Sequence, residues 1–280
     1  MTPIDIETIA RILEQTAQEE ILPRFRALAD EDIREKQGGE LVTVADEAAE
    51  RTLTRRLRDA LPGSHVVGEE AVAGNPAILE QLAREDWVWV IDPVDGTGNF
   101  AAGRAAFATM IGLLHDGRTV AAWIHEPVAG RTAMAERGAG AVLDGRPVSL
   151  VPPPRPDPAE LSGTLHASSF APPEMARRVQ RRRHRVNAIK SLRCAGLEYL
   201  RLLSGEMQFS LFTRLMPWDH VPGTLIHAEA GGTSRTLDGR PYEARSYRAK
   251  GLLIAPDGRS WERLHAALFD DAPPGLVGRK

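Results

Sequence analysis

Two aspartates, Asp92 and Asp95, follow a run of apolar residues and give the clearest sign of chemistry in this sequence. The run, Val88 to Ile91, has the length and composition of a buried strand. Pro93, between the two aspartates, has no N–H and fixes its own φ angle, so we expect the strand to end there. Two carboxylates are therefore expected to lie close together at one strand end.

Carboxylates crowded in this way repel one another unless a cation lies between them, and hard oxygen ligands favour Mg²⁺ or Mn²⁺. The carboxyl ends of strands are also where open α/β sheets usually place their sites. Gly96 permits a tight turn directly after the aspartates, and Thr97 adds a hydroxyl. The segment therefore predicts a cation site.

Three further acidic segments lie at the boundaries of expected elements. Asp46 opens one helix, Asp219 opens another, and Glu69 and Glu70 follow a short apolar run. Each has an ordinary structural explanation when taken alone: an acid in a first helical turn, an N-cap, or an exposed loop pair. Their joint occurrence favours a site with several metal ions.

The elements that must position these side chains alternate along the chain. Hydrophobic periodicity predicts helices over 3–30, 45–61, 173–183, 196–204 and 219–230. It predicts strands over 66–67, 88–91, 107–114, 120–125, 132–135, 161–166, 188–192 and 207–212. Such alternation favours a layered α/β (α+β) architecture over a bundle or a barrel.

A segment with five prolines, 152–158, is typical of a linker. We therefore expect an N-terminal half over 1–152, which carries most of the acids, and a C-terminal half over 153–280, which carries Asp219.

Composition excludes several classes of protein. The chain of 280 residues can bury a sizeable core, and its formal charge of −3 gives no bulk attraction to nucleic acid or membranes. The single cysteine, Cys194, excludes an intrachain disulfide and suits a reducing cytoplasm. We see no signal peptide at the N-terminus, and the apolar run 107–114 is far shorter than the ~20 residues of a spanning helix. We therefore expect a cytoplasmic protein with no membrane or nucleic-acid polymer as partner.

A basic run, Arg177 to Arg185, contains six arginines. It lacks the aromatic residues that a single-strand nucleic-acid binder would use for stacking. We therefore expect a solvated helix face or a loop at a dimer edge.

The acidic segments together resemble the inositol monophosphatase family of metal-dependent phosphomonoesterases. The family's Asp-Pro-hydrophobic-Asp-Gly-Thr-x-Asn-Phe signature matches Asp92 to Phe100. Its Trp-Asp-x-x-x-Gly signature, followed by Gly-Gly, matches Trp218 to Gly223 with Gly231-Gly232. Its Gly-Glu-Glu and Thr-x-x-Asp segments match Gly68 to Glu70 and Thr43 to Asp46. The resemblance covers about residues 5–265 and implies the layered αβαβα sandwich of the inositol monophosphatase and fructose-1,6-bisphosphatase type.

The resemblance implies a site for two or three Mg²⁺ ions, with Mn²⁺ as an alternative. Glu69, Asp92 and the backbone carbonyl of Val94 would hold the first ion. Asp92, Asp95 and Asp219 would hold the second, and Glu69 would touch a third, weaker one.

The resemblance also implies which residues act on the phosphate and on water. The backbone N–H groups of Gly96 and Thr97 would meet the phosphate, and Asp46 would act with Thr97 to activate the attacking water. Glu69 and Asp46 thus join Thr97 as catalytic residues, and Glu70 would support the ligands from behind. Two cations can hold the water and the leaving oxygen of a phosphomonoester for an in-line displacement. The expected enzyme is a phosphoric monoester hydrolase, homodimeric and sensitive to lithium.

The substrate-facing positions depart from the family pattern. Phe212 stands where the family has a glutamate that contacts inositol hydroxyls, and the family's Gly-Thr-Ala or Gly-Ser-Ala loop becomes Gly196-Leu197-Glu198. Glu198 could take over hydroxyl recognition, whereas Arg193 and Arg214 could favour a second phosphate or a carboxylate. The expected substrate-binding residues are Asp95, Gly96, Thr97, Gly196, Glu198, Phe212, Arg214 and Asp219.

Several small phosphorylated metabolites remain open as substrates: an inositol phosphate, histidinol phosphate, fructose bisphosphate and 3′-phosphoadenosine 5′-phosphate. Two readings belong to other classes. An actin-like or sugar-kinase ATPase would need a second phosphate turn, but Asp238-Gly239-Arg240 lacks the hydroxyl. An inactive binding module would need the loss of a ligand, yet the metal-binding carboxylates are all present.

Overall fold

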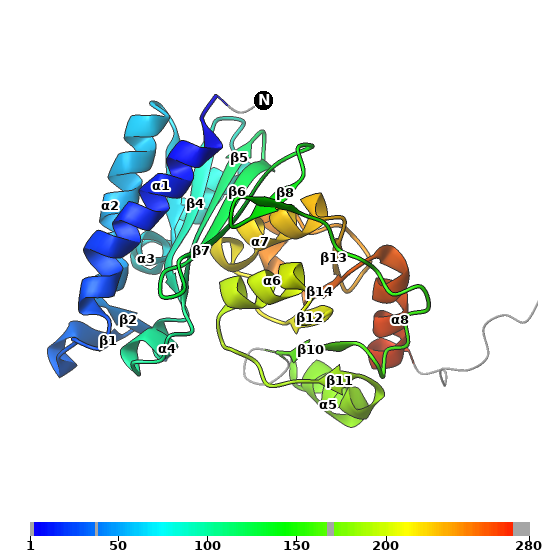
Figure 1. The fold of residues 1–280 in the computed structure, drawn as a ribbon. Helices are drawn as coiled ribbons and strands as arrows, with labels where there is room; N and C mark the ends of the chain where they lie inside the picture. The colour runs from blue at the N-terminus through cyan, green and yellow to red at the C-terminus, as the bar shows by residue number, and fades with distance from the viewer. Residues whose placement is uncertain (1–2, 37–38, 167–170, 271–280) are drawn as a thin grey trace, which may run out of the picture.

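The computed structural model describes residues 3–36, 39–166 and 171–270 and shows five layers: helices, sheet, helices, sheet, helices (Figure 1). The first sheet has seven strands in the order β3-β4-β5-β6-β7-β8-β9, and the second has five in the order β11-β10-β12-β14-β13. The expected αβαβα sandwich is confirmed.

The first sheet is built from residues 65–148. Its strands are β3 (His65–Gly68), β4 (Val88–Asp95), β5 (Ala108–His115), β6 (Arg118–Glu126), β7 (Arg131–Glu136), β8 (Ala141–Leu143) and β9 (Arg146–Val148). Only β3 and β4 pair in parallel, and the remaining neighbours pair antiparallel. The carboxyl ends of β3 and β4 therefore lie at one edge, which brings the residues after both strands together.

The second sheet is built from residues 162–255. Its strands are β10 (Ser162–Leu165), β11 (Asn187–Ala188), β12 (Phe209–Phe212), β13 (Thr233–Thr236) and β14 (Leu252–Ala255). Strands β10 and β12 are parallel, with Thr164 opposite Ser210. A separate antiparallel pair, β1 (Ile33–Glu35) and β2 (Leu41–Thr43), precedes both sheets.

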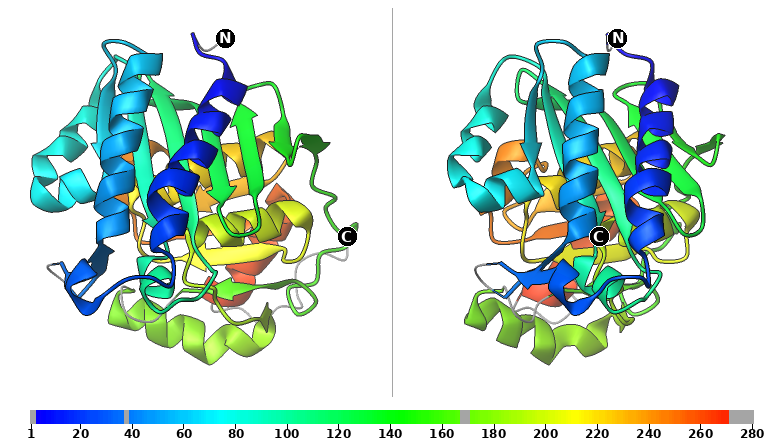
Figure 2. Two further views of the ribbon diagram at one scale, coloured as in Figure 1. Left: turned by 60° about the vertical axis from the view of Figure 1, so that its left-hand side comes forward. Right: turned by 90° about the vertical axis from the view of Figure 1, so that its left-hand side faces the viewer.

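Three helix layers enclose the two sheets. Helices α1 (Ile6–Thr16) and α2 (Val44–Ala60) cover the outer face of the first sheet (Figure 2). Their apolar side chains pack with Trp89 and Trp123 of this sheet. Helices α6 (Ala195–Ser204) and α7 (Pro217–Glu229) lie between the sheets, and α5 (Pro173–Arg182) and α8 (Gly258–Phe269) cover the second sheet. The short helices are α3 (Glu69–Gly74) and α4 (Thr97–Ala101).

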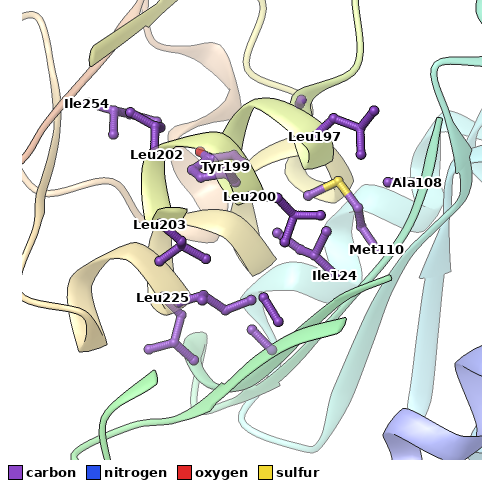
Figure 3. Close-up of a cluster of buried hydrophobic side chains, with 14 of the residues drawn as sticks. Ala108, Met110, Ile124, Leu197, Tyr199, Leu200, Leu202, Leu203, Leu225 and Ile254 are labelled. Atoms are coloured by element: carbon purple, nitrogen blue, oxygen red, sulfur yellow. The ribbon is translucent and has the colours of Figure 1, made fainter. Parts of the chain in front are cut away.

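The central layer is tightly packed because α6 and α7 are apolar towards both sheets. Leu200, Leu203 and Leu225 lie with Met110 and Ile124 of the first sheet in one buried cluster (Figure 3). In a second buried cluster, Trp218 and Val221 at the beginning of α7 pack with Val88 and Val90 of β4, and this packing places Asp219 beside that strand.

Strand β4 does not end at Ile91, so that part of the sequence prediction is wrong. The strand continues to Asp95, and its register with β5 shifts between Asp92 and Asp95. Pro93 is tolerated because it lies in this bulge, where a ladder hydrogen bond is already lost. The bulge leaves both aspartates buried in the strand itself.

Other boundaries also differ from the sequence prediction. The first helix is α-helical only to Thr16 and continues as a π turn, Ala17–Ile21, and a 3₁₀ turn, Leu22–Arg24. The strand expected over 188–192 is only two residues long. The sequence prediction did not include β1, β2, β8, β9, β13, β14, α3 and α8. No helix in the described part of the chain is long and apolar enough to cross a membrane.

The basic run is not simply a solvated face. Arg178, Arg182 and Arg185 donate hydrogen bonds to the carbonyls of Phe269, Leu268 and Ala267 at distances of 3.0, 3.4 and 3.3 Å. Those carbonyls belong to the last turn of α8, where cations stabilise the negative end of the helix dipole. This contact joins α5 to α8.

Candidate active site

Asp92 lies at the centre of a buried carboxylate cluster. Its side chain is 2 % exposed, and its Oδ1 atom has no hydrogen-bond partner among the described residues. Burial raises the pKa of Asp92 well above its ordinary value, and repulsion from Glu69, Asp95, Asp219 and Asp46 raises it further. All four acidic segments therefore lie close enough to Asp92 to affect its pKa.

Asp95 and Asp219 are held beside Asp92 by the β4 bulge and the beginning of α7. Burial raises the pKa of Asp95 to about 6, although Gly196 and Cys194 donate hydrogen bonds to it. Asp219 lies in the first turn of α7, and burial with repulsion from Asp95 raises its pKa well above the ordinary value. These raised pKa values indicate carboxylates that lack a compensating cation.

Glu69 and Glu70 directly follow β3, as the sequence predicts, and they begin the helix α3, which it did not predict. The ammonium group of Lys36 lies 2.9 Å from Glu69 Oε1 and 2.7 Å from Glu70 Oε1, and its side chain is only 11 % exposed. Glu50 of α2 accepts hydrogen bonds from the Glu70 and Ala71 N–H groups and so fixes the start of α3. Lys36 is thus the cation that these two acids hold in this structure.

Asp46 lies in the first turn of α2, where Thr43 is the N-cap residue, and it also reaches the turn formed by Gly96 and Thr97. Its Oδ2 accepts hydrogen bonds from the N–H and hydroxyl of Thr43, which is a capping box. Its Oδ1 accepts a 2.9 Å hydrogen bond from the Thr97 hydroxyl, which also lies 3.0 Å from the Val94 carbonyl. Burial raises the pKa of Asp46 to about 6.

The turn after β4 requires glycine. Gly96 has a φ of +92°, and a Cβ there would lie 2.8 Å from the Ala106 carbonyl oxygen. Asn99 holds the turn by donating hydrogen bonds to the carbonyls of Ala106 and Leu192, at 2.7 and 2.8 Å. The turn is therefore tied to the segment that precedes α6.

The start of α6 faces Asp95. Asp95 Oδ2 accepts hydrogen bonds from the Gly196 N–H at 2.5 Å and from the Cys194 thiol at 3.1 Å. Cys194 is 1 % exposed and is the N-cap residue of α6. Of the predicted substrate loop Gly196-Leu197-Glu198, Gly196 contacts Asp95, and so does Cys194, which precedes the loop. The only sequence signal for Cys194 was its place just before a helix.

The other candidate substrate-binding residues, Glu198, Phe212 and Arg214, contact other residues of the protein. Glu198 has no exposed surface, and both of its carboxylate oxygens accept hydrogen bonds. The ring of Phe212 stacks on His166 and is 5 % exposed. The guanidinium of Arg214 forms an ion pair with Glu40. Neither Glu198 nor Phe212 presents a polar group to a substrate in this arrangement.

The carboxylate oxygens of this cluster are suitable ligands for a divalent cation, although several of them contact protein groups in this structure. Within the described residues, no three or more carboxylate, imidazole or thiol side chains converge on one point as a ready-made site. Lys36 holds Glu69, and Cys194 with Gly196 holds Asp95. The unpartnered, buried oxygen of Asp92 lies among carboxylates that repel one another, which is the environment that a hard cation stabilises.

Comparison with known proteins agrees with this geometry. A model of the inositol monophosphatase family matches residues 5–273 of the chain. The chain belongs to the inositol monophosphatase family. Like other members of this family, it is a phosphomonoesterase of the metal-dependent type.

Two relatives illustrate the range of the family. An inositol-1-monophosphatase of Mycobacterium leprae is 34 % identical over 233 residues, which is 81 % of this chain and 77 % of the relative. A protein of Pseudomonas aeruginosa named Nus factor SuhB is 29 % identical over 266 residues, which is 90 % of this chain and 92 % of the relative.

Among solved structures, an IMPase of Thermotoga maritima superposes with a TM-score of 0.79 at 22 % sequence identity. The match covers 94 % of this chain and 96 % of that one. The likeness shows that the inositol monophosphatase family and this chain share one fold.

Proposed function

We propose that this chain hydrolyses a small phosphomonoester with the help of bound Mg²⁺ and an activated water molecule. The observation that carries the proposal is the placement of four acidic segments around Asp92, whose buried Oδ1 atom has no hydrogen-bond partner among the described residues. Such a cluster is costly in a buried site unless cations occupy it.

The residues proposed to hold the ions are those that the resemblance implied. Glu69, Asp92 and the Val94 carbonyl would hold one ion, and Asp92, Asp95 and Asp219 would hold a second. Glu69 would also touch a third, weaker one. When bound, the ions would lower the pKa of a coordinated water and neutralise charge on the phosphate and the leaving oxygen.

Asp46 and Thr97 would orient the attacking water and help to remove its proton. Because the pKa of Asp46 is about 6, its carboxylate is ionised at neutral pH. It accepts the Thr97 hydroxyl hydrogen at 2.9 Å, which leaves a lone pair of Thr97 Oγ1 for the water's hydrogen. The backbone N–H groups of Gly96 and Thr97 would bind the phosphate. Because the activated water would be the nucleophile, no covalent intermediate with a protein side chain is required.

We propose four candidates for the physiological phosphomonoester. An inositol phosphate, histidinol phosphate, fructose 1,6-bisphosphate and 3′-phosphoadenosine 5′-phosphate all have the required bond. The glutamate that contacts inositol in the family is replaced by Phe212, and Glu198 is fully buried. We therefore propose that inositol itself is not the best leaving group.

A screen of these four phosphomonoesters with Mg²⁺, ranked by kcat/KM, tests the proposal. We expect Mg²⁺-dependent release of phosphate from at least one of them, abolished by a chelator and restored by added Mg²⁺. Absence of metal-dependent phosphate release from every member would contradict the proposed function.

We also propose, from the family resemblance, a homodimer in the cytoplasm that is inhibited by lithium. Light scattering of the purified protein tests the dimer, and a lithium titration of the phosphatase activity tests the inhibition. A monomeric mass or an activity unchanged by millimolar lithium would remove the corresponding part of this proposal.

A further inference from the structure

Arg104 contacts the 96–99 turn, which carries the N–H groups proposed to bind the phosphate. Its Nε–H group donates a 2.9 Å hydrogen bond to Asn99 Oδ1, and its Nη2 group donates a 3.2 Å hydrogen bond to the Gly98 carbonyl. Its backbone N–H group donates to the Asn99 carbonyl at 2.9 Å. A guanidinium is always protonated, and its planar fork can hold two acceptors at once. These three hydrogen bonds close the segment 98–104 into a loop.

The same contacts fix the direction of the buried Asn99 amide. Because Arg104 can only donate, the amide oxygen must face it, and the amide nitrogen then faces the opposite way. That nitrogen donates to the carbonyls of Ala106 and Leu192 at 2.7 and 2.8 Å. Arg104 is the one side-chain donor to Asn99 Oδ1 among the described residues, and a buried oxygen without a donor is costly. Loss of Arg104 would therefore release the amide from both carbonyls.

The segment that Asn99 holds has an unusual backbone. Arg193, which follows Leu192, has a φ of +55°, which is uncommon for a residue with a side chain. It lies against Gly96, since a Cβ on Gly96 would lie 3.4 Å from the Arg193 carbonyl oxygen. Such a conformation persists only where the surrounding contacts hold it. The Asn99 amide nitrogen, 3.4 Å from the same carbonyl, provides such a contact.

We propose that Arg104 is a positioning residue, which acts through Asn99 to hold the N–H groups of the 96–99 turn in the geometry that binds phosphate. The inference rests on the proposed phosphatase function and adds a residue outside the acidic segments. The proposed metal ligands Glu69, Asp92 and Asp219 make none of these hydrogen bonds. Loss of Arg104 should therefore weaken the binding of phosphate and leave the binding of metal unchanged.

Binding of inorganic phosphate to the Mg²⁺-loaded protein, measured by isothermal titration calorimetry, tests the proposal without turnover. Arg104→Ala should raise the Kd for phosphate about tenfold, the effect of losing a charge-assisted hydrogen bond. The Kd for Mg²⁺, measured without phosphate, should stay within about twofold of the wild-type value. With a phosphomonoester that the enzyme hydrolyses, KM should rise by the same factor as the phosphate Kd while kcat changes less than about twofold.

Three further variants separate position from charge. Arg104→Lys keeps the charge but not the planar fork, so it should weaken phosphate binding nearly as much as Arg104→Ala does. Arg118→Ala removes one positive charge at an exposed arginine of the same half and should keep the wild-type affinity. In an Asn99→Ala background, Arg104→Ala should have no further effect, because the residue through which Arg104 acts is then absent.

Wild-type phosphate affinity in Arg104→Ala would overturn the proposal. Wild-type affinity in Arg104→Lys would overturn it too, because charge alone would then explain the effect. A full additional loss in the Asn99→Ala background would show that Arg104 acts on phosphate directly, and an equal loss of Mg²⁺ binding would show general damage to the site; either result contradicts the proposal.

If Asn99→Ala does not fold, the comparison of alanine with lysine at position 104 decides. Failure of the proposed function is distinct, because the wild-type protein would then bind phosphate but release none from any phosphomonoester with Mg²⁺. Absence of phosphate binding by the Mg²⁺-loaded wild-type protein would overturn the role of Arg104 itself.

Discussion

Asp92 has a buried oxygen without a hydrogen-bond partner, although the protein places donors beside its neighbours. Thr43 and Thr97 donate hydrogen bonds to Asp46, and Cys194 and Gly196 donate hydrogen bonds to Asp95. These donors orient Asp46 and Asp95, whereas the Oδ1 atom of Asp92 has no hydrogen-bond partner among the described residues and would be satisfied by a bound cation. We regard this division as the residue-scale basis of the proposed metal site.

Lys36 holds the acids at the other edge and gives the first prediction. Its ammonium group pairs with Glu69 and Glu70, so a metal ion that uses Glu69 must displace it. Lys36→Gln should therefore bind Mg²⁺ about fivefold more tightly, the value of an ion pair of about 1 kcal/mol. Isothermal titration calorimetry measures this change, and Lys190→Gln, at an exposed lysine, serves as the control. Unchanged or weaker Mg²⁺ binding in Lys36→Gln would show that Lys36 does not compete with the ion.

The sequence predicted which acids lie near one another, but not their partners. Asp46, Glu69 and Asp219 lie in the first turns of helices, and Asp92 follows an apolar run; both kinds of position can be recognised in the sequence. The partners Lys36, Cys194 and His166 come from loops and strand ends whose approach depends on the packing of both sheets. No local sequence pattern indicates that these loops and strand ends lie beside the acids, so only the structure reveals these contacts.

At the scale of elements, α7 is the part whose position matters most for the site, because it carries Asp219. It lies against α6 at Gly223, where the ring of Tyr199 leaves no space for a side chain. A Cβ on Gly223 would lie 2.2 Å from Tyr199 Cδ2. The glycine therefore sets how closely the two central helices approach.

Gly223→Ala is the element-scale prediction. Overpacking at this contact should lower the free energy of unfolding by about 2–3 kcal/mol. Gly74→Ala, at a glycine with open space around its Cβ position, should change it by less than about 0.5 kcal/mol. Urea unfolding followed by fluorescence measures both variants. Equal stabilities of the two variants would mean that α6 and α7 are not held at this distance.

The order of elements could be predicted from the sequence where the hydrophobic period is long. Helix α2 was predicted over 45–61 and found at Val44–Ala60, because its apolar face repeats over four turns. Strands β8 and β9 have three residues each and depend on their neighbours in the sheet, so they have no clear period of their own. The bulge in β4 was missed because tertiary pairing with β5 outweighs the local effect of Pro93.

At the scale of the whole molecule, the buried carboxylates should make the free energy of unfolding depend on both pH and bound metal. Burial raises the pKa of Asp46 to about 6 and that of Glu70 to about 8. A carboxyl whose pKa is higher in the folded state stabilises the fold fully below about pH 4, and this contribution is lost as the pH rises through the folded value. A bound cation offsets that loss by stabilising the ionised carboxylates.

The stabilisation by Mg²⁺ should therefore grow with pH. We expect the rise in the unfolding midpoint caused by saturating Mg²⁺ to be larger at pH 8.5 than at pH 5.5, by roughly 5 °C. Burial lowers the pKa values of His220 and His227 to about 4, so these histidines destabilise the fold at acid pH. Comparing samples with and without Mg²⁺ at each pH removes their effect. A stabilisation independent of pH would argue against metal binding by these carboxylates.

The central claim is that Asp92 anchors the metal ions on which phosphomonoester hydrolysis depends. The most direct test is the Mg²⁺-dependent kcat of Asp92→Asn, with Asp116→Asn, at an exposed turn, as the matched control. We predict that kcat falls by about 10³-fold or more in Asp92→Asn while the fold persists, and that Asp116→Asn is unaffected. A folded Asp92→Asn protein with near-wild-type, Mg²⁺-dependent activity would contradict the account.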